Sequence, residues 1–270
     1  MKKFLSFNLI TVFLFLLSFA LIQSTASANH KWNRYHWARK SNPFTIKLGD
    51  NVSGTWDSHL NTSSADWTVS TVLNTNVVAG GTSASTCAAT TGRVEICNST
   101  YGSTGWLGVA QVWLYDNRGH ISKGTVKVND SYSMNSAEKL HVMCQEVGHT
   151  FGLGHQSTSG ASLNTCMDYY ANTSDSDMTS TKPNQHDYDQ LVSIYSHTDS
   201  FTTIASAPPA AWDSIRLDGP GQWGKLVERS TNGQYETYML DFGNGYKVLT
   251  FVIWAGPNNK VVGQNDRNWR

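Results

Sequence analysis

Residues 145–155, which read QEVGHTFGLGH, constrain the fold more than any other part of the chain. Gln145 and His149 are four residues apart, so on a helix their side chains lie on one face and can share one metal ion. Gly152 allows a sharp turn after that helix. His155 can then return as a third ligand and leave a fourth position for water, as in catalytic zinc sites. The spacing therefore predicts a helix that ends in a metal site.

The segment resembles the active site of the metzincin clan of zinc metallopeptidases, and more closely that of secreted matrixin-like members. That clan carries His-Glu-x-x-His-x-x-Gly-x-x-His followed by a methionine turn. The resemblance implies that Glu146 is the general base and that one catalytic zinc is bound. It also implies that Met167, twelve residues after His155, forms the methionine turn. Tyr169 is then a candidate to contact the metal or to stabilise the transition state.

The departure from this pattern is Gln145, which stands where the clan has its first histidine ligand. A glutamine amide oxygen is a weaker and harder donor than an imidazole, so metal affinity should fall. His141 is about 12 Å from His149 along a regular helix, too far to share one ion. His120 and His186 are not placed near the site by any sequence signal. Gln145 is therefore expected to be the weak third ligand beside His149 and His155.

Several neighbouring residues have a structural interpretation. Met167 can fill the core beneath the metal. Cys144 lies on the apolar side of the predicted helix. It is therefore expected to form a disulfide and not to bind the metal. The pair at 186–187 resembles a surface pair of structural use. Glu146 favours catalysis over a purely structural site, because such a site has no need of a base.

The four cysteines are consistent with an exported protein that forms disulfides. Of the three possible pairings, we favour Cys87–Cys97 as a local loop and Cys144–Cys166 as a clamp. The clamp would tie the motif helix to the segment that follows it. No cysteine precedes residue 87, so no thiol-based latency device is expected.

The first 28 residues are typical of a secretory signal peptide. Lys2 and Lys3 precede a mostly apolar run from Phe4 to Ile22, and Ala26-Ser27-Ala28 provides a cleavage site. An uncleaved membrane anchor is the alternative. Without the two lysines the chain carries 18 basic and 20 acidic residues, a net charge of −2. Nucleic acid is therefore not an expected partner, and no membrane contact is expected after cleavage.

Local patterns predict an α+β fold in which a twisted mixed sheet packs on the active-site helix. We expect strands at 44–48, 77–81, 109–115 and 121–128, the last two forming a hairpin around a turn at 116–119. Helices are predicted at 56–67, from Asn135 or Ser136 to Gly152, and at 185–195. Leu140, Met143, Cys144, Val147 and Phe151 recur at helical spacing and should form a buried stripe.

The C-terminal part reads as a linker at 205–211 followed by three strands with Asn-Gly turns, at 222–229, 235–242 and 247–254. The division is a signal peptide at 1–28, a metzincin-like domain at 29–200, and a linker with a small C-terminal β-meander at 201–270.

The leading hypothesis is a secreted, monomeric zinc endopeptidase that cleaves protein or peptide substrates with metal-activated water and Glu146 as base. The resemblance implies that the 109–128 hairpin lies above the metal and that its edge strand pairs with extended substrate. The first alternative is a catalytically weak or inactive module that binds peptide, protein or cell-wall polymer. The second is an extracellular metal-binding structural protein. Calcium sites are not predicted.

Overall fold

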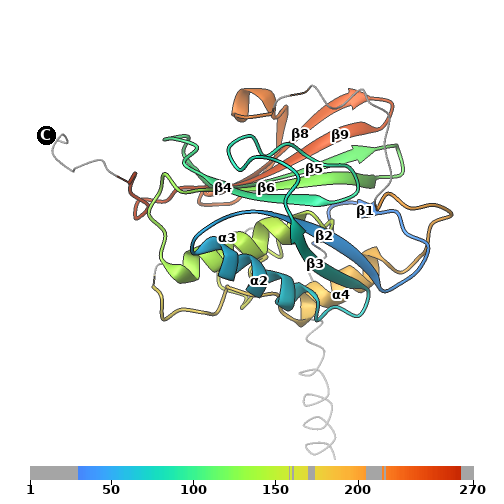
Figure 1. Ribbon diagram of the computed structural model, residues 1–270, viewed down its shortest axis with the longest axis horizontal. Helices are drawn as coiled ribbons and strands as arrows, with labels where there is room; N and C mark the ends of the chain where they lie inside the picture. The colour runs from blue at the N-terminus through green and yellow to red at the C-terminus, as the bar shows by residue number, and fades with distance from the viewer. Residues whose placement is uncertain are drawn as a thin grey trace, which may run out of the picture.

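The computed structural model describes residues 30–157, 159, 161–169, 174–204, 215 and 217–262, and within them nine strands form one sheet (Figure 1). The order is β3-β2-β4-β6-β5-β9-β8-β7, and β1 also pairs with β6. The strands are β1 (His36–Trp37), β2 (Phe44–Asn51), β3 (Leu73–Ala79), β4 (Val94–Ser99), β5 (Trp106–Tyr115), β6 (His120–Asn129), β7 (Lys225–Arg229), β8 (Tyr235–Gly243) and β9 (Tyr246–Trp254).

The sheet has a parallel half and an antiparallel half, which meet at β6. Strand β2 runs parallel to β3 and β4, and β4 runs parallel to β6. Beyond β6 the pairs β5–β6, β5–β9, β8–β9 and β7–β8 are antiparallel. A helical crossover joins β2 to β3, as parallel pairing requires, whereas tight turns join β5 to β6 and β8 to β9. The predicted α+β class with a mixed sheet is thus confirmed.

Three helices lie on one side of this sheet: α2 (Trp56–Trp67), α3 (Ser136–His149) and α4 (Gln185–Ile194) (Figure 1). A short 3-10 helix, η2, spans Pro220–Gln222. Both α3 and α4 begin with a capping box, in which an asparagine side chain and an acidic residue three positions on satisfy each other's backbone N–H groups. Asn135 is the cap of α3 and Asn184 that of α4, so the predicted helix starts are confirmed.

The motif helix α3 packs against β5, β6 and β9 of the sheet and against α2. Its predicted apolar stripe is confirmed, because the five side chains that define it are all buried. They are Leu140, Met143, Cys144, Val147 and, just beyond the helix, Phe151. This packing fixes the face of α3 that carries the site.

The C-terminal meander forms as predicted, but it continues the main sheet. Strand β9 pairs with β5 from Trp106↔Trp254 to Tyr115↔Tyr246. The expectation that the 109–128 hairpin offers an edge strand to substrate is therefore wrong for this conformation, since β5 is paired on both sides. The edge of this half of the sheet is β7, which is separated from β6 by the three strands β5, β9 and β8.

Both predicted disulfides, Cys87–Cys97 and Cys144–Cys166, are present. The first closes a loop beside β4, and the second joins α3 to the segment after it. The predicted signal peptide and most of the predicted linker lie outside the described residues. Within those residues, none of the helices is both long and apolar enough to cross a membrane.

Candidate active site

Helix α3 places Gln145, Glu146 and His149 near its C-terminal end, where all three side chains are buried. Gly148 allows close packing there. A Cβ on Gly148 would lie 2.5 Å from a ring atom of Trp67 and 2.6 Å from the Met167 sulfur. Only a residue without a side chain leaves room for both groups at this position.

His155 returns to His149 because the chain reverses at Gly152. Gly152 has φ +95°, a left-handed conformation that favours glycine, and a Cβ there would lie 2.2 Å from the carbonyl oxygen of Tyr35. The reversal brings the Nε2 atoms of His149 and His155 to 3.1 Å from each other. Two zinc ligands at about 2.0–2.1 Å in tetrahedral geometry are about 3.3 Å apart, so this spacing fits a shared ion.

The partners of the two rings decide which nitrogen carries the proton. His149 Nδ1 lies 2.9 Å from the carbonyl oxygen of Leu153, which only accepts, so the proton is on Nδ1 and Nε2 presents a lone pair. His155 Nδ1 lies 3.9 Å from Glu228 Oε2. If His155 donated from Nε2 to His149, its Nδ1 lone pair would face that carboxylate. A cation between the Nε2 atoms removes this conflict and leaves a proton on Nδ1.

Burial also keeps both imidazoles neutral. It lowers the pKa of His149 well below its usual value, and the neighbouring His155 adds to that effect. Burial likewise lowers the pKa of His155, with smaller contributions from His30 and His141. Neutral imidazole is the form that binds metals.

Gln145 is held with its amide oxygen unclaimed. Its Nε2 donates to the backbone oxygens of Cys166, at 2.6 Å, and Asp168, at 2.7 Å. Two carbonyl acceptors require the NH2 group on that side, which settles the amide orientation. Gln145 Oε1 is then buried with no hydrogen-bond partner in the described part of the chain. An unclaimed acceptor one helical turn from His149 fits a metal-ligand role.

Glu146 is a buried carboxyl group that faces β5. A Cβ on Gly108 of β5 would lie 2.9 Å from Glu146 Oε1, so the glycine makes room for the carboxyl. Neither oxygen makes a hydrogen bond of normal geometry with the described residues. Burial raises the pKa of Glu146 well above its usual value, and the nearby backbone N–H of Ala110 opposes the rise. A raised pKa strengthens a carboxylate as a proton acceptor, which suits a general base.

The segment after His155 brings Met167 and Tyr169 to the site. Met167 is fully buried against α3 at Gly148. The Tyr169 ring centroid lies 4.2 Å from that of His155. Its hydroxyl is buried without a hydrogen-bond partner among the described residues, and burial raises its pKa, with Glu228 adding to the rise. The structure therefore brings His149, His155 and Tyr169 into contact and places Gln145 and Glu146 on the same buried helix end as His149.

Three residues of the C-terminal strands cover the site and were missed in the sequence. The Phe251 ring of β9 stacks on His149, with centroids 4.0 Å apart and planes 7° apart. The Tyr235 ring of β8 lies 4.7 Å from that of Tyr169. Glu228 of β7 faces His155. The Asn-Gly turns predicted these strands, but no local signal predicts that β9 pairs with β5.

The other candidates have structural roles. His141 Nδ1 is 2.6 Å from the carbonyl oxygen of Ser180 and Nε2 is 3.2 Å from the Tyr235 hydroxyl, which keeps it out of the site as expected. Cys144 is in its disulfide. Asp187 is fully buried and caps α4, so the expectation of a surface pair at 186–187 is wrong for this residue, while the structural role is confirmed.

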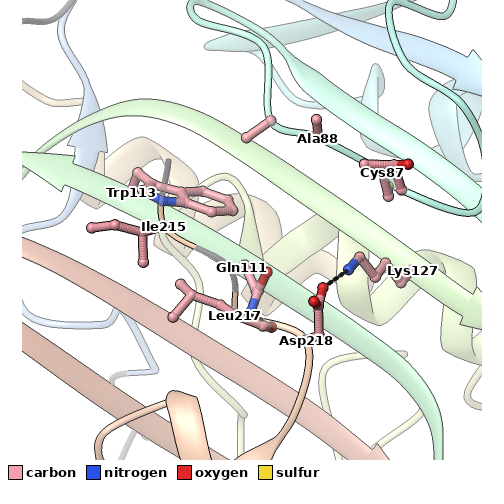
Figure 2. Close-up of a pocket in the computed structure, with 10 residues that line it drawn as sticks. Cys87, Ala88, Gln111, Trp113, Lys127, Ile215, Leu217 and Asp218 are labelled. Atoms are coloured by element: carbon pink, nitrogen blue, oxygen red, sulfur yellow. Dashed lines mark hydrogen bonds and ion pairs between the residues drawn. The ribbon is translucent and has the colours of Figure 1, made fainter. Parts of the chain in front are cut away.

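A separate cavity of about 190 Å³ lies on the face of β5 that points away from helix α3 (Figure 2). Figure 2 shows Gln111 and Trp113 of β5 beside Leu217 and an ion pair between Lys127 and Asp218, whose nearest atoms are 3.6 Å apart. Residues 110 and 112 point the other way, into the core beneath α3. The cavity therefore has no contact with the motif residues and is not part of the candidate active site.

No family model matches the sequence. No curated protein matches it. Among solved structures, the chain is similar to the one titled "Structure of myroilysin", with 12% identity and a TM-score of 0.35 over 62% of this chain and 98% of that chain. A TM-score of this size carries no argument, so the site has to be interpreted from its own geometry.

Proposed function

We propose that the chain is a secreted zinc-dependent endopeptidase of the metzincin type. The observation that carries the proposal is the approach of two imidazole donors at the end of a buried helix that also carries Gln145. Two neutral imidazole Nε2 atoms lie 3.1 Å apart, and Gln145 contributes an amide oxygen without a partner. Glu146, one residue from the first donor, supplies a buried carboxyl group with a raised pKa.

Gln145, His149 and His155 would hold the zinc ion. Bound zinc supplies Lewis-acid chemistry, which polarises a peptide carbonyl and makes water acidic enough to lose a proton near neutral pH. Glu146 takes that proton on its carboxylate and passes it to the leaving amine. The Tyr169 hydroxyl donates a hydrogen bond to the carbonyl oxygen that gains charge. Protein or peptide is the proposed substrate.

A non-catalytic binding module is the second candidate, and one observation favours it. The side chains of β8 and β9 cover the site, and its residues are between 0% and 8% exposed. A peptide reaches Glu146 only if this cover opens. A covered site with all its donors intact also suits a protein that binds metal without turnover.

Zinc content and cleavage of a broad peptide library, measured on the purified protein and on Glu146→Ala, test the proposal. Stoichiometric zinc in both proteins, with cleavage lost only in Glu146→Ala, supports an enzyme. Zinc without any cleavage supports the binding module. A protein that takes up no zinc at its 145–155 motif contradicts both.

A further inference from the structure

A second group of metal-binding side chains lies outside the candidate active site. It joins His36 of β1, His120 of β6, and His197 and Asp199 from the segment after α4. One ring nitrogen from each of His36 and His120 and one carboxylate oxygen of Asp199 lie within 4.8 Å of one another. His197 Nε2 is 3.1 Å from His36 Nε2 and 3.8 Å from Asp199 Oδ1. This group shares no residue with the 145–155 motif.

Outer partners turn the Nε2 atoms of His36 and His120 toward Asp199. His36 Nδ1 is 2.6 Å from the carbonyl oxygen of Arg34, and His120 Nδ1 is 2.6 Å from Asp116 Oδ2. Both outer atoms accept, so each imidazole carries a proton on Nδ1, and Nε2 is the atom that can bind a metal. Metal-binding histidines in proteins have this arrangement, with the second nitrogen donating to a carboxylate or a backbone carbonyl.

These Nε2 atoms face an anion at short range. His120 Nε2 lies 3.3 Å from Asp199 Oδ1, and His36 Nε2 lies 3.5 Å from Asp199 Oδ2. A metal cation between the two Nε2 atoms and the carboxylate would attract all three groups. The distances are close to the roughly 3.3 Å between ligands of a tetrahedral zinc ion.

The Arg39 cation contacts Asp199. Its backbone N–H and its guanidinium Nη1 are 3.1 Å and 2.9 Å from Asp199 Oδ2. This leaves Oδ1 for a ligand role, toward His120 and His197.

We propose that His36, His120, His197 and Asp199 bind one divalent transition-metal ion, with zinc the best match to three imidazoles and a carboxylate. Four protein ligands close the coordination shell, which is typical of a structural site. The ion would join the N-terminal strand β1 and the segment after α4 to the sheet at β6. His197 is half exposed, with 49% of its side chain accessible, and gives the ion a way in.

The test measures zinc binding by competition with a chromophoric chelator, and Co²⁺ absorption, on the full chain. His197→Ala is the key variant, because a half-exposed side chain can be removed without unfolding the protein. We expect one class of zinc site to weaken at least about 100-fold and tetrahedral Co²⁺ absorption to lose the matching contribution. Asp116→Asn should weaken the same class about 10- to 100-fold, since the outer acceptor for His120 is lost.

Two matched variants show which site is affected. His149→Gln combined with His155→Gln removes the proposed active site and should leave this class of zinc site intact. His186→Ala removes a member of the other described His/Asp group, formed with His30 and Asp187. The proposal is overturned if His197→Ala leaves the zinc affinity unchanged. It is also overturned if the loss of zinc affinity occurs in His186→Ala and not in His197→Ala.

Discussion

At the scale of single residues, Gln145 occupies the first ligand position of the motif, and its surroundings fix the orientation of its amide. Two backbone carbonyls, of Cys166 and Asp168, hold its NH2 group and direct the amide oxygen away from them. A carboxylate at this position would repel both carbonyls. The local backbone therefore explains why an amide suits this helix position, even though imidazole is the better zinc donor.

We expect Gln145→His to bind zinc about tenfold more tightly or better, because an imidazole nitrogen replaces a weak amide donor. Chelator competition measures the affinity, and Gln145→Leu, which removes the donor, should bind more weakly than the wild type. Equal affinities in all three proteins would show that residue 145 is not a ligand. If peptide cleavage appears only in Gln145→His, the wild-type site is catalytically lapsed.

Glu146→Gln should change how the stability of the metal-free protein depends on pH. The folded pKa of Glu146 is raised by burial, so the folded protein holds a proton that the unfolded chain releases above about pH 4.3. Stability is thus present at low pH and is lost as pH rises toward the folded pKa, by about 1.4 kcal/mol per pH unit.

The glutamine variant lacks this loss, so its stability relative to the wild type should grow as pH rises. Urea denaturation with chelator present, at several pH values from 4 upward, measures the difference. A constant difference across the pH range would contradict the raised pKa.

At the scale of elements, the contact between α3 and β5 depends on Gly108. A Cβ there would lie 2.6 Å from Val142 Cγ1 and 2.9 Å from Glu146 Oε1. Gly108→Ala should therefore cost about 1–3 kcal/mol of stability and displace the Glu146 carboxyl, with loss of any activity.

Gly124 of β6 is a matched control for this substitution. It is buried in the neighbouring strand, and a Cβ there has only ordinary contacts, the nearest at 3.4 Å. Gly124→Ala should change stability by less than about 1 kcal/mol. Equal costs for the two variants, measured by urea denaturation, would mean that the space at Gly108 is not specific to the site.

The two disulfides should differ in what they support. Replacing Cys144 and Cys166 by alanine should cost about 2–4 kcal/mol and also weaken zinc binding at the motif, because Cys166 holds the Gln145 amide. Replacing Cys87 and Cys97 should reduce stability and leave zinc affinity unchanged. If neither pair of substitutions changes the zinc affinity, the Cys144–Cys166 disulfide does not support zinc binding at the motif.

At the scale of the whole molecule, local signals predicted most elements and part of the site. Short-range sequence patterns determine helix caps and tight turns. The caps Asn135 and Asn184 and the turn at 116–119 therefore allowed α3, α4 and the β5–β6 hairpin to be predicted. Strand β4 was missed because it is short and lacks alternation, with four buried residues in succession. Pairing of β9 with β5 joins residues more than 100 positions apart, and no local pattern encodes it.

The two proposed sites differ in exposure, so we expect them to lose metal at different rates. The motif ligands are covered by β8 and β9, whereas His197 is half exposed. Excess chelator should remove zinc in two phases, a fast one from the group around His197 and a slow one limited by opening of the cover. The fast phase should disappear in His197→Ala. Release in one phase from the fully loaded wild type would contradict this picture.

The Cys144–Cys166 bridge makes the chemistry of the site depend on when the protein is oxidised. Until the bridge forms, the carbonyl of Cys166 has lost one of the links that hold it against the Gln145 amide, and the weakest of the three proposed donors has less support. A chain kept in a thiol-rich compartment would therefore carry an incomplete metal site. In the proposed peptidase, the bridge would thus delay hydrolysis until the protein reaches an oxidising compartment.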